Sequence, residues 1–235
     1  ALSSAASDVY KRQIMAIENS IAGSILPNLG ILHNSRLQVT GEYYLHIRQN
    51  LMALPGVGLE GIEEVHSHPM ALLQCVDFLD THRWRLVETE DTALSARRIA
   101  ERGIRNAAAI AGDLAAELFG LEIVAADIHS IRNNYTRFLV LRPDHQPIDE
   151  RSDKASLCFK TDHRHGSLIR VLREMEDSTI NMTKLQSSPI PSEPWHYMFH
   201  VDMEFACMDD YNRVIERMRS VTSELHVYGV YRKGQ

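Results

Sequence analysis

Hydrophobic and polar positions follow two successive patterns along the chain. Between residues 14 and 141, short apolar runs alternate with amphipathic segments, which predicts strands alternating with helices. Such alternation is typical of an α/β protein with a mostly parallel sheet covered on both faces. From residue 154 the predicted order is strand, helix, strand, strand, helix, strand, which is the ferredoxin-like order. The stretch 142–153 between the two parts is charged, contains two prolines and has no apolar period, so it is predicted to be a linker.

The individual elements follow from the same pattern and from turn and cap residues. The expected strands cover residues 14–18, 37–54, 62–66, 85–87, 107–110, 123–126 and 138–141, and then 155–160, 180–186, 195–204 and 225–231. The expected helices cover residues 20–33, the segment opened by Ser67-His68-Pro69, and residues 91–102, 113–119, 166–175 and 209–221. In the helix that follows Pro69, the steps between Met70, Leu73, Val76 and Leu79 are three residues long, which predicts that they share one side.

Composition and charge narrow the class of protein. The net charge is −6 and neither sign forms long runs, which argues against a nucleic-acid binder with a basic patch. No apolar stretch is long enough to span a bilayer and no signal peptide is recognisable, so a cytoplasmic location is expected. The three cysteines, Cys75, Cys158 and Cys207, lie far apart, which indicates free thiols. Residues 1–13 are small and polar and are interpreted as an artefactual tail or a disordered terminus.

Two stretches at predicted helix starts could bind an anion. Glu18-Asn19-Ser20 stands at a strand end, where helix N–H groups suit an anion; the alternative is a simple helix cap. Gln74 follows Ser67 by seven residues, close to two helical turns, so the two side chains are expected on one face. Together they could hold a carboxylate or carbonyl, or they could be only a cap and an exposed amide.

Two further stretches carry polar chemistry. In Asn133-Asn134-Tyr135-Thr136-Arg137-Phe138, the Arg can pair with a carboxylate and the Thr hydroxyl lies beside it, although an Asn-rich turn feeding a strand is the alternative. The stretch 88–92 is acidic and hydroxyl-rich, and it is interpreted as a solvated loop that caps the next helix. His66 and His68 do not form an HExxH motif, and no Walker loop, GxGxxG or GxSxG is present, so a metal site is not expected.

Taken together, several strings resemble the bacterial prephenate dehydratases over nearly all of residues 14–235. In the first part these strings are AIENSIAGS (16–24), HSHPMALLQC (66–75), AAAIAGDLAAELFGLEI (107–123) and NNYTRFLVL (133–141). In the second part they are HGSLIRVLREME (165–176), INMTKLQSSP (180–189) and WHYMFHVDME (195–204). The resemblance implies a periplasmic-binding-protein-like, two-lobed catalytic domain at 14–141 and a βαββαβ ACT domain, which is regulatory, at 154–235.

The activity implied by the resemblance is conversion of prephenate to phenylpyruvate in phenylalanine biosynthesis. Carbon dioxide and the ring hydroxyl are lost, and aromatisation drives the reaction, so no cofactor is expected. The resemblance assigns Thr136 as hydrogen-bond donor to the leaving hydroxyl. It assigns Asn19, Ser67 and Gln74 to orienting the substrate, with Glu18 beside them.

Other roles complete the expected picture. We add Arg137 as a candidate for carboxylate binding or support, with its neighbour Phe138 in the substrate site. The resemblance also implies that the ACT domain binds L-phenylalanine as a feedback effector. Its carboxylate would meet the N–H groups of Gly166, Ser167 and Leu168, with Asn181 and Met182 facing it across a dimer interface. A homodimer or homotetramer is therefore expected, with no nucleic acid and no membrane as partner.

The sequence departs from the family pattern in three places. Family chains open with a strand and a Gly-Pro…Gly-Thr-Phe loop that borders the active site, so the catalytic domain here is expected to be partial. Gln186 and Ser188 stand where the family has Glu and Arg, and Met70 stands where many members have Gln. Two alternatives remain open: an arogenate dehydratase, and an inactive fragment whose ACT domain binds an amino acid.

Overall fold

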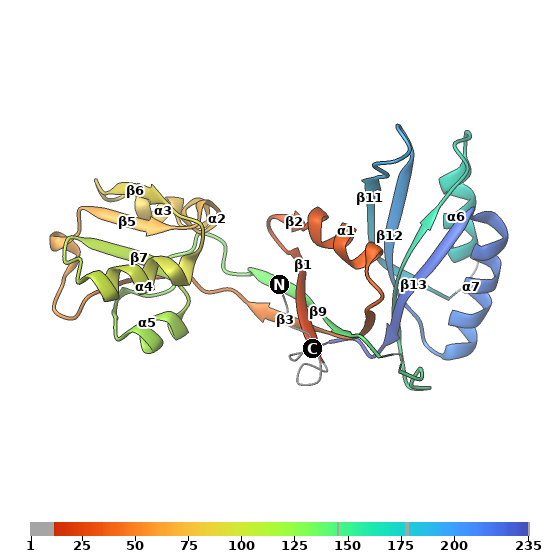
Figure 1. The fold of residues 1–235 in the computed structure, drawn as a ribbon, viewed down its shortest axis with the longest axis horizontal. Coiled ribbons are helices and arrows are strands. Elements are labelled where there is room, and N and C mark those ends of the chain that lie inside the picture. Colours follow the sequence, from red (N-terminus) through yellow and green to blue (C-terminus); the bar gives the residue numbers. More distant parts are fainter. Residues whose placement is uncertain (1–11, 145, 177–178, 235) are drawn as a thin grey trace. The chain divides into compact units, whose positions relative to one another are not determined.

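The computed structural model describes residues 12–144, 146–176 and 179–234 (Figure 1). The chain forms two compact units. The first unit contains the described parts of 1–45 and 136–235, and the second contains 46–135. The chain therefore leaves the first unit after Leu45 and returns to it at Thr136. Each unit is described below by itself.

The second unit is built on a five-stranded sheet with the order β6-β5-β7-β4-β8. These strands are β4 (Asn50–Ala53), β5 (Glu64–Ser67), β6 (Arg85–Glu88), β7 (Ala107–Ala111) and β8 (Glu122–Ala125). β5 is parallel to β6 and β7, while β4 is antiparallel to β7 and β8. The mostly parallel sheet is thus confirmed for this unit, with β4 inserted in the opposite direction. The ten residues between β4 and β5 contain only the short 3-10 helix η1 (Leu59–Gly61), and this connection is shorter than a parallel crossover requires.

Helices cover both faces of this sheet. They are α2 (Pro69–Gln74), α3 (Val76–Leu79), α4 (Thr92–Arg102) and α5 (Asp113–Phe119). All five residues of β7 are buried: Ala108 and Ile110 pack in one apolar cluster with Leu72 of α2. The other three alanines of β7 pack in a second cluster with Ile99 of α4. A strand buried on both faces explains why this run contains no polar residue.

One prediction for this unit was wrong. Met70, Leu73 and Val76 are 38%, 65% and 40% exposed, whereas Leu72 and Cys75 are buried. A three-residue step falls short of the 3.6-residue turn, so residues at that spacing drift around the helix. The helix is also divided at Cys75 into α2 and α3.

The first unit opens with a four-stranded sheet of order β2-β1-β9-β3. Its elements are β1 (Gln13–Asn19), β2 (Gly23–Ser24), α1 (Leu26–Asn34), β3 (Gln38–His46) and β9 (Tyr135–Arg142). β1 is antiparallel to both β2 and β9, so the parallel sheet expected from strand-helix alternation does not extend to these strands. They join through a tight turn and through a long return from the other unit, and neither connection imposes a parallel direction.

Three boundaries differ from those predicted here. The first helix begins at Leu26, because the chain turns at Asn19 and returns as β2 before a proline opens α1. The extended stretch expected at 37–54 is divided into β3 and β4, which belong to different units. Of the expected tail 1–13, residues 1–11 lie outside the described residues, but Gln13 belongs to β1.

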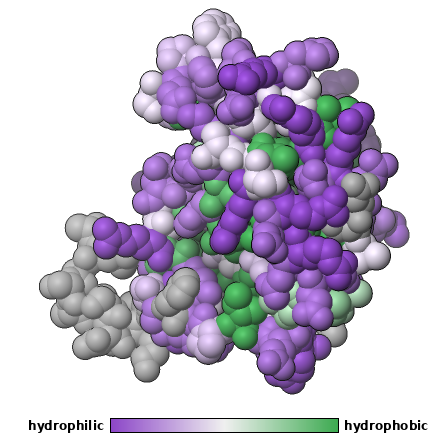
Figure 2. All heavy atoms as spheres, turned by 90° about the vertical axis from the view of Figure 1, so that its right-hand side faces the viewer, coloured by the Kyte–Doolittle hydropathy of each residue, from purple (hydrophilic) through white to green (hydrophobic). Residues whose placement is uncertain are grey.

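The C-terminal part of the first unit confirms the ferredoxin-like order. It consists of β10 (Lys154–Lys160), α6 (Ser167–Glu176), β11 (Asn181–Pro189), β12 (Tyr197–Glu204), α7 (Met208–Val221) and β13 (Glu224–Tyr231). The strands form an antiparallel sheet of order β11-β12-β10-β13. α6 and α7 pack on one face of it through residues such as Val171 and Val214. The outer side of these helices is mainly hydrophilic (Figure 2).

The other face of this sheet shares a core with the first strands of the chain. Cys158 of β10 and Tyr228 of β13 pack in one buried cluster with Leu32 of α1 and Val39 of β3. Gly229 permits this close approach, because a Cβ atom there would lie 1.9 Å from the carbonyl oxygen of Val39. The stretch 142–153 also packs on this unit: Ser152 is 3% exposed. No helix of the described residues is long and apolar enough to cross a membrane.

Candidate functional site

Asn19 and Thr136 are joined at the paired ends of β1 and β9 in the first unit. Their register places Asn19 opposite Thr136. The Asn19 side-chain nitrogen donates to the Thr136 hydroxyl oxygen over 3.1 Å. The Asn19 side-chain oxygen accepts the backbone N–H groups of Ile21 and Ala22 at 3.0 and 2.9 Å. Because two donors hold that oxygen, the nitrogen must face Thr136, which fixes the orientation of the amide.

Thr136 therefore accepts in this pair and keeps its own proton for another group. The side chain is half-buried at the start of β9. Among the residues that the structure describes, Asn19 is its hydrogen-bond partner. A hydroxyl that accepts one hydrogen bond is polarised to donate another. The pair can thus present a donor to an oxygen that gains negative charge.

Glu18 belongs to an ion cluster next to this pair. It lies opposite Arg137 in the strand register. Its carboxylate is 3.0 Å from the Lys184 ammonium and 3.7 Å from the Arg137 guanidinium. The Glu18 side chain is 33% exposed, whereas the two cations are 6% and 7% exposed. The predicted catalytic carboxylate is therefore held by two buried cations.

The guanidinium of Arg137 is enclosed by groups of the protein itself. Its Nε donates to Glu42 over 2.6 Å, and its other nitrogens donate to Asp202 and to the Tyr231 hydroxyl. Burial alone would lower the pKa of Arg137, but Asp202, Tyr231 and Glu42 raise it above its ordinary value. Lys154 completes the cluster with a 2.9 Å contact to Glu42. This geometry fits the supporting role of Arg137 better than direct contact with a substrate carboxylate.

Ser67 and Gln74 belong to the second unit. Ser67 ends β5, is fully buried and donates its hydroxyl to the carbonyl of Ile110 over 2.7 Å. It does not cap α2: the cap is His68, whose Nδ1 accepts the backbone N–H of Met70 at 3.2 Å. The side-chain oxygen of Gln74 accepts from Gln49 over 3.3 Å. The Ser67 oxygen can still accept, and the Gln74 amide can still donate.

Sequence reasoning missed some polar residues of this unit. Gln49 is 6% exposed and holds Gln74, but nothing in a polar residue between two apolar runs signals that contact. The loop 88–92 was interpreted correctly, because Asp91 caps α4 by accepting the backbone N–H of Leu94 at 2.8 Å. This loop also lies beside Ser67, whose carbonyl accepts the Thr89 N–H over 2.9 Å.

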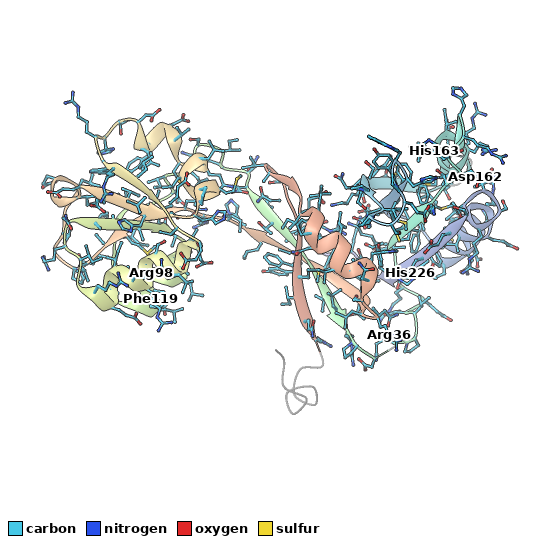
Figure 3. The ribbon with its side chains drawn as sticks, turned by 45° about the horizontal axis from the view of Figure 1, so that its top comes forward. Arg36, Arg98, Phe119, Asp162, His163 and His226 are labelled. Atoms are coloured by element: carbon cyan, nitrogen blue, oxygen red, sulfur yellow. The ribbon has the colours of Figure 1, made fainter. Side chains whose placement is uncertain are left out.

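The expected effector residues lie in two places on the C-terminal sheet. Gly166, Ser167 and Leu168 line a cavity of about 420 Å³. The loop 161–165 ahead of α6 also lines it, and Asp162 and His163 are labelled there in Figure 3. Gly166 has φ +78°, which suits glycine.

Two observations bear on which of the predicted effector residues could contact a ligand in this cavity. The Ser167 N–H already donates to the Arg164 carbonyl at 3.2 Å. The N–H groups of Gly166 and Leu168 are therefore the ones expected to bind a ligand. Asn181 and Met182 pair with Glu204 and Met203 on β12 and do not line the cavity.

The remaining predicted residues can be placed briefly. Phe138 is half-buried in β9, opposite Ala16 of β1. Burial raises the pKa of the Cys75 thiol to about 12, as expected for an inert core cysteine. Within the described part of the chain, no group of three or more His, Cys, Asp or Glu side chains is placed to hold a metal ion.

The family model and the curated relatives point to one family. The family model described as prephenate dehydratase matches residues 1–146. The bifunctional chorismate mutase/prephenate dehydratase of Neisseria gonorrhoeae is 38% identical over 224 residues, which are 93% of this chain and 61% of that protein. Arogenate dehydratase/prephenate dehydratase 2, chloroplastic, of Arabidopsis thaliana is 35% identical over 231 residues, covering 94% of this chain and 61% of that protein. The chain thus spans about 61% of the length of these curated relatives.

Solved structures share the fold over 97% of the chain. The prephenate dehydratase of Arthrobacter aurescens in complex with L-Phe has a TM-score of 0.85 and 25% identity, with 77% of that chain covered. A structure described as "GqqA- a novel type of quorum quenching acylases" has a TM-score of 0.88 and 26% identity, with 85% of that chain covered. The matched length, the identities and the shared fold together lead to one conclusion: the chain belongs to the prephenate dehydratase family.

Proposed function

We propose that this chain catalyses the decarboxylating dehydration of a 4-hydroxycyclohexadiene carboxylate, with prephenate as substrate and phenylpyruvate as product. The observation that carries the proposal is the Asn19–Thr136 hydrogen bond, which leaves the Thr136 proton for a leaving oxygen. The curated relatives described above, dehydratases of prephenate or arogenate, support the same reaction class.

In this reaction the bond between ring C1 and its carboxylate breaks, and carbon dioxide leaves. The electron pair of that bond moves through the ring and expels the C4 hydroxyl as hydroxide, which takes up a proton from the solvent to give water. Thr136 donates a hydrogen bond to the departing oxygen, and Asn19 holds the Thr136 hydroxyl in orientation. A threonine hydroxyl is too weak an acid to transfer its proton fully, so its effect is stabilisation of the charge that develops.

The other predicted residues take roles in binding. Ser67 and Gln74 orient the substrate, and Arg137 with Phe138 supports the strand that carries Thr136. Prephenate has a keto group beside its second carboxylate, whereas arogenate has an amine there. The protein side chain that meets this part of the substrate would decide between the two. Arogenate is therefore the second substrate to be tested.

An acylase is the second candidate function, because the fold closely matches a structure described as one. A hydroxyl nucleophile for acyl transfer needs an adjacent base that removes its proton. Thr136 has instead a neutral amide donor as its partner. This contact favours the dehydratase.

We also propose that L-phenylalanine binds the ACT domain, in a dimer, and lowers the activity. The neighbouring structure solved in complex with L-Phe supports this effector. The Gly166 and Leu168 N–H groups at the cavity edge suit its carboxylate. The effector can inhibit only if it binds two states of the enzyme with different affinities.

The test measures turnover of prephenate and of arogenate by the chain and by three variants. Thr136→Val removes the hydroxyl at constant volume, and we expect kcat to fall by about 10²–10³-fold. Thr136→Ser keeps a hydroxyl and is the matched control that retains most activity. Asn19→Asp replaces the donor to Thr136 by an acceptor and is expected to lower kcat similarly.

Each outcome has a meaning for the proposal. Equal activity of Thr136→Val and the parent would overturn the role of Thr136. Hydrolysis of an N-acyl amide without turnover of either dehydratase substrate would establish the acylase instead. Turnover of arogenate alone would change the substrate and keep the mechanism.

A further inference from the structure

Lys184 is a buried cation that the reaction proposed above does not use. Its side chain is 7% exposed. Among the described residues the ion-pair partner of its ammonium is the Glu18 carboxylate, at 3.0 Å. A buried ammonium is costly unless a counter-charge lies close to it. Glu18 is therefore held at this position by Lys184.

The two ion partners of Glu18 depend on it unequally. Arg137 has Glu42 and Asp202 as further carboxylate partners, and its contact with Glu18 is longer, at 3.7 Å. Lys184 has Glu18. Removing Lys184 would leave the Glu18 carboxylate with only its longer, 3.7 Å contact to Arg137 among the described residues, whereas Arg137 would remain anchored without Glu18.

The backbone brings Lys184 to this point through an irregularity in β11. The pairing of β11 with β12 shifts between Met182 and Lys184. The pairing of β1 with β9 shifts in the same way between Ala16 and Glu18. An extra residue in a strand re-aims the side chains beside it. Both members of the ion pair therefore follow a bulge, and a change in either bulge would move their contact.

The same bulge connects the expected effector strand with the catalytic pair. Asn181 and Met182, expected at the effector site, lie three and two residues before Lys184 on β11. Glu18 directly precedes Asn19, which holds Thr136. Lys184, Arg137 and Asp202 also line one small internal cavity of about 10 Å³, so these charged groups face a common space.

We propose that Lys184 is a positioning residue for the Asn19–Thr136 pair, acting through Glu18, and that it transmits the state of β11 to this pair. The catalytic part of this inference rests on the dehydratase function proposed above. The structural part does not, because it concerns the placement of the Asn19 amide. An electrostatic contact suits such a link, since an ammonium displaced by one bulge residue no longer fixes the carboxylate.

The experiment compares Lys184→Met and Lys184→Arg with Lys233→Met in the full chain. Lys233 is an exposed lysine on the same part of the chain, 3.5 Å from Glu204, and serves as the matched control. We expect Lys184→Met to lower kcat by about tenfold to 100-fold with little change in KM, as displaced catalytic groups do. Lys184→Arg keeps the charge and is expected to recover most of kcat. Phenylalanine should still bind Lys184→Met by calorimetry but should no longer inhibit it.

A second readout does not depend on turnover. The side-chain amide signals of Asn19 in a ¹⁵N correlation spectrum, assigned with Asn19→Asp, should shift in Lys184→Met and not in Lys233→Met. If the parent turns over neither substrate while the Asn19 signals shift, the proposed function fails and the positioning role stands. Should kcat, inhibition and the Asn19 signals all match the parent, the positioning role is overturned. Equal losses in Lys184→Met and Lys233→Met would overturn it as well. If Lys184→Met does not fold, Glu18→Gln takes its place with the same readouts.

Discussion

At the scale of single residues, Arg137 shows how a side chain next to a candidate catalytic group can act through structure. It was a candidate for carboxylate binding or support, and it lies in a buried cluster with Glu42, Asp202 and Lys154. Two cations and two anions compensate one another there. Removing one member leaves the others without compensation, which is more costly than replacing the whole set.

Arg137→Met is therefore expected to destabilise the first unit by about 3–5 kcal/mol, because Glu42 would keep Lys154 while the buried Asp202 would lose its ion pair with Arg137. Urea unfolding, followed by a probe in that unit, measures the change. Arg142→Met is the matched control, since Arg142 pairs with the half-exposed Asp144 and is expected to change stability little. Unchanged stability with a raised KM would instead mean that Arg137 binds the substrate carboxylate.

The residues of the site differ in how far the sequence reveals them. Asn19, Ser67, Gln74 and Thr136 stand in strings that resemble a family, so they could be named in advance. Lys184 stands in such a string too, but lysine is ordinarily exposed. Only the packed structure shows that this lysine is buried against a carboxylate 166 positions earlier in the chain.

At the scale of elements, helices and strands with a regular hydrophobic period were predicted correctly, whereas turns and strand connections were not. The strand, helix, strand, strand, helix, strand order was correct because each element of the C-terminal part has its own clear period. The predicted start of α1 was wrong, because Asn19 can cap a helix or close a tight turn with similar hydrogen bonds. The insertion of β4 between β7 and β8 leaves no local trace either, since strand direction depends on distant pairing.

Substitution of Gly229 is predicted to lower stability, because this glycine lets β13 approach β3 closely. A Cβ atom there would meet the carbonyl oxygen and Cβ of Val39 at 1.9 and 2.8 Å. Gly229→Ala should cost about 1–3 kcal/mol or more, because backbone cannot move aside as a side-chain end can. Gly30→Ala is the control: it adds a methyl to α1 with nothing within 4 Å, and should stabilise by about 0.5–1 kcal/mol. Thermal unfolding of both variants decides; an unchanged midpoint for Gly229→Ala would mean that the two strands separate easily.

At the scale of the whole molecule, the order of domains along the sequence and the compact units do not coincide. The sequence predicts a catalytic domain at 14–141 followed by a linker and an ACT domain. The structure groups the first strands with the C-terminal sheet, and the continuous segment 46–135 forms the other unit. The shared core of Cys158, Tyr228 and Val39 is the physical reason, because neither side of it could be exposed without loss of buried apolar surface.

This grouping predicts which fragments fold. The segment 46–135 has its own sheet with apolar clusters on both faces, so it should unfold in one cooperative transition when produced alone. The segment 154–235 would expose Cys158 and Tyr228 and would leave Asp202 without Arg137, so its midpoint of thermal unfolding should lie well below that of the same sheet in the full chain. Calorimetry of both fragments and of the full chain tests this. An isolated 154–235 as stable as in the full chain would show that the C-terminal sheet is independent of β1, β3 and β9. In that case the ion pairs of Lys184 and Arg137 would not couple the C-terminal sheet to the first strands. Coupling is reciprocal, so strands that do not stabilise the sheet cannot respond to its state.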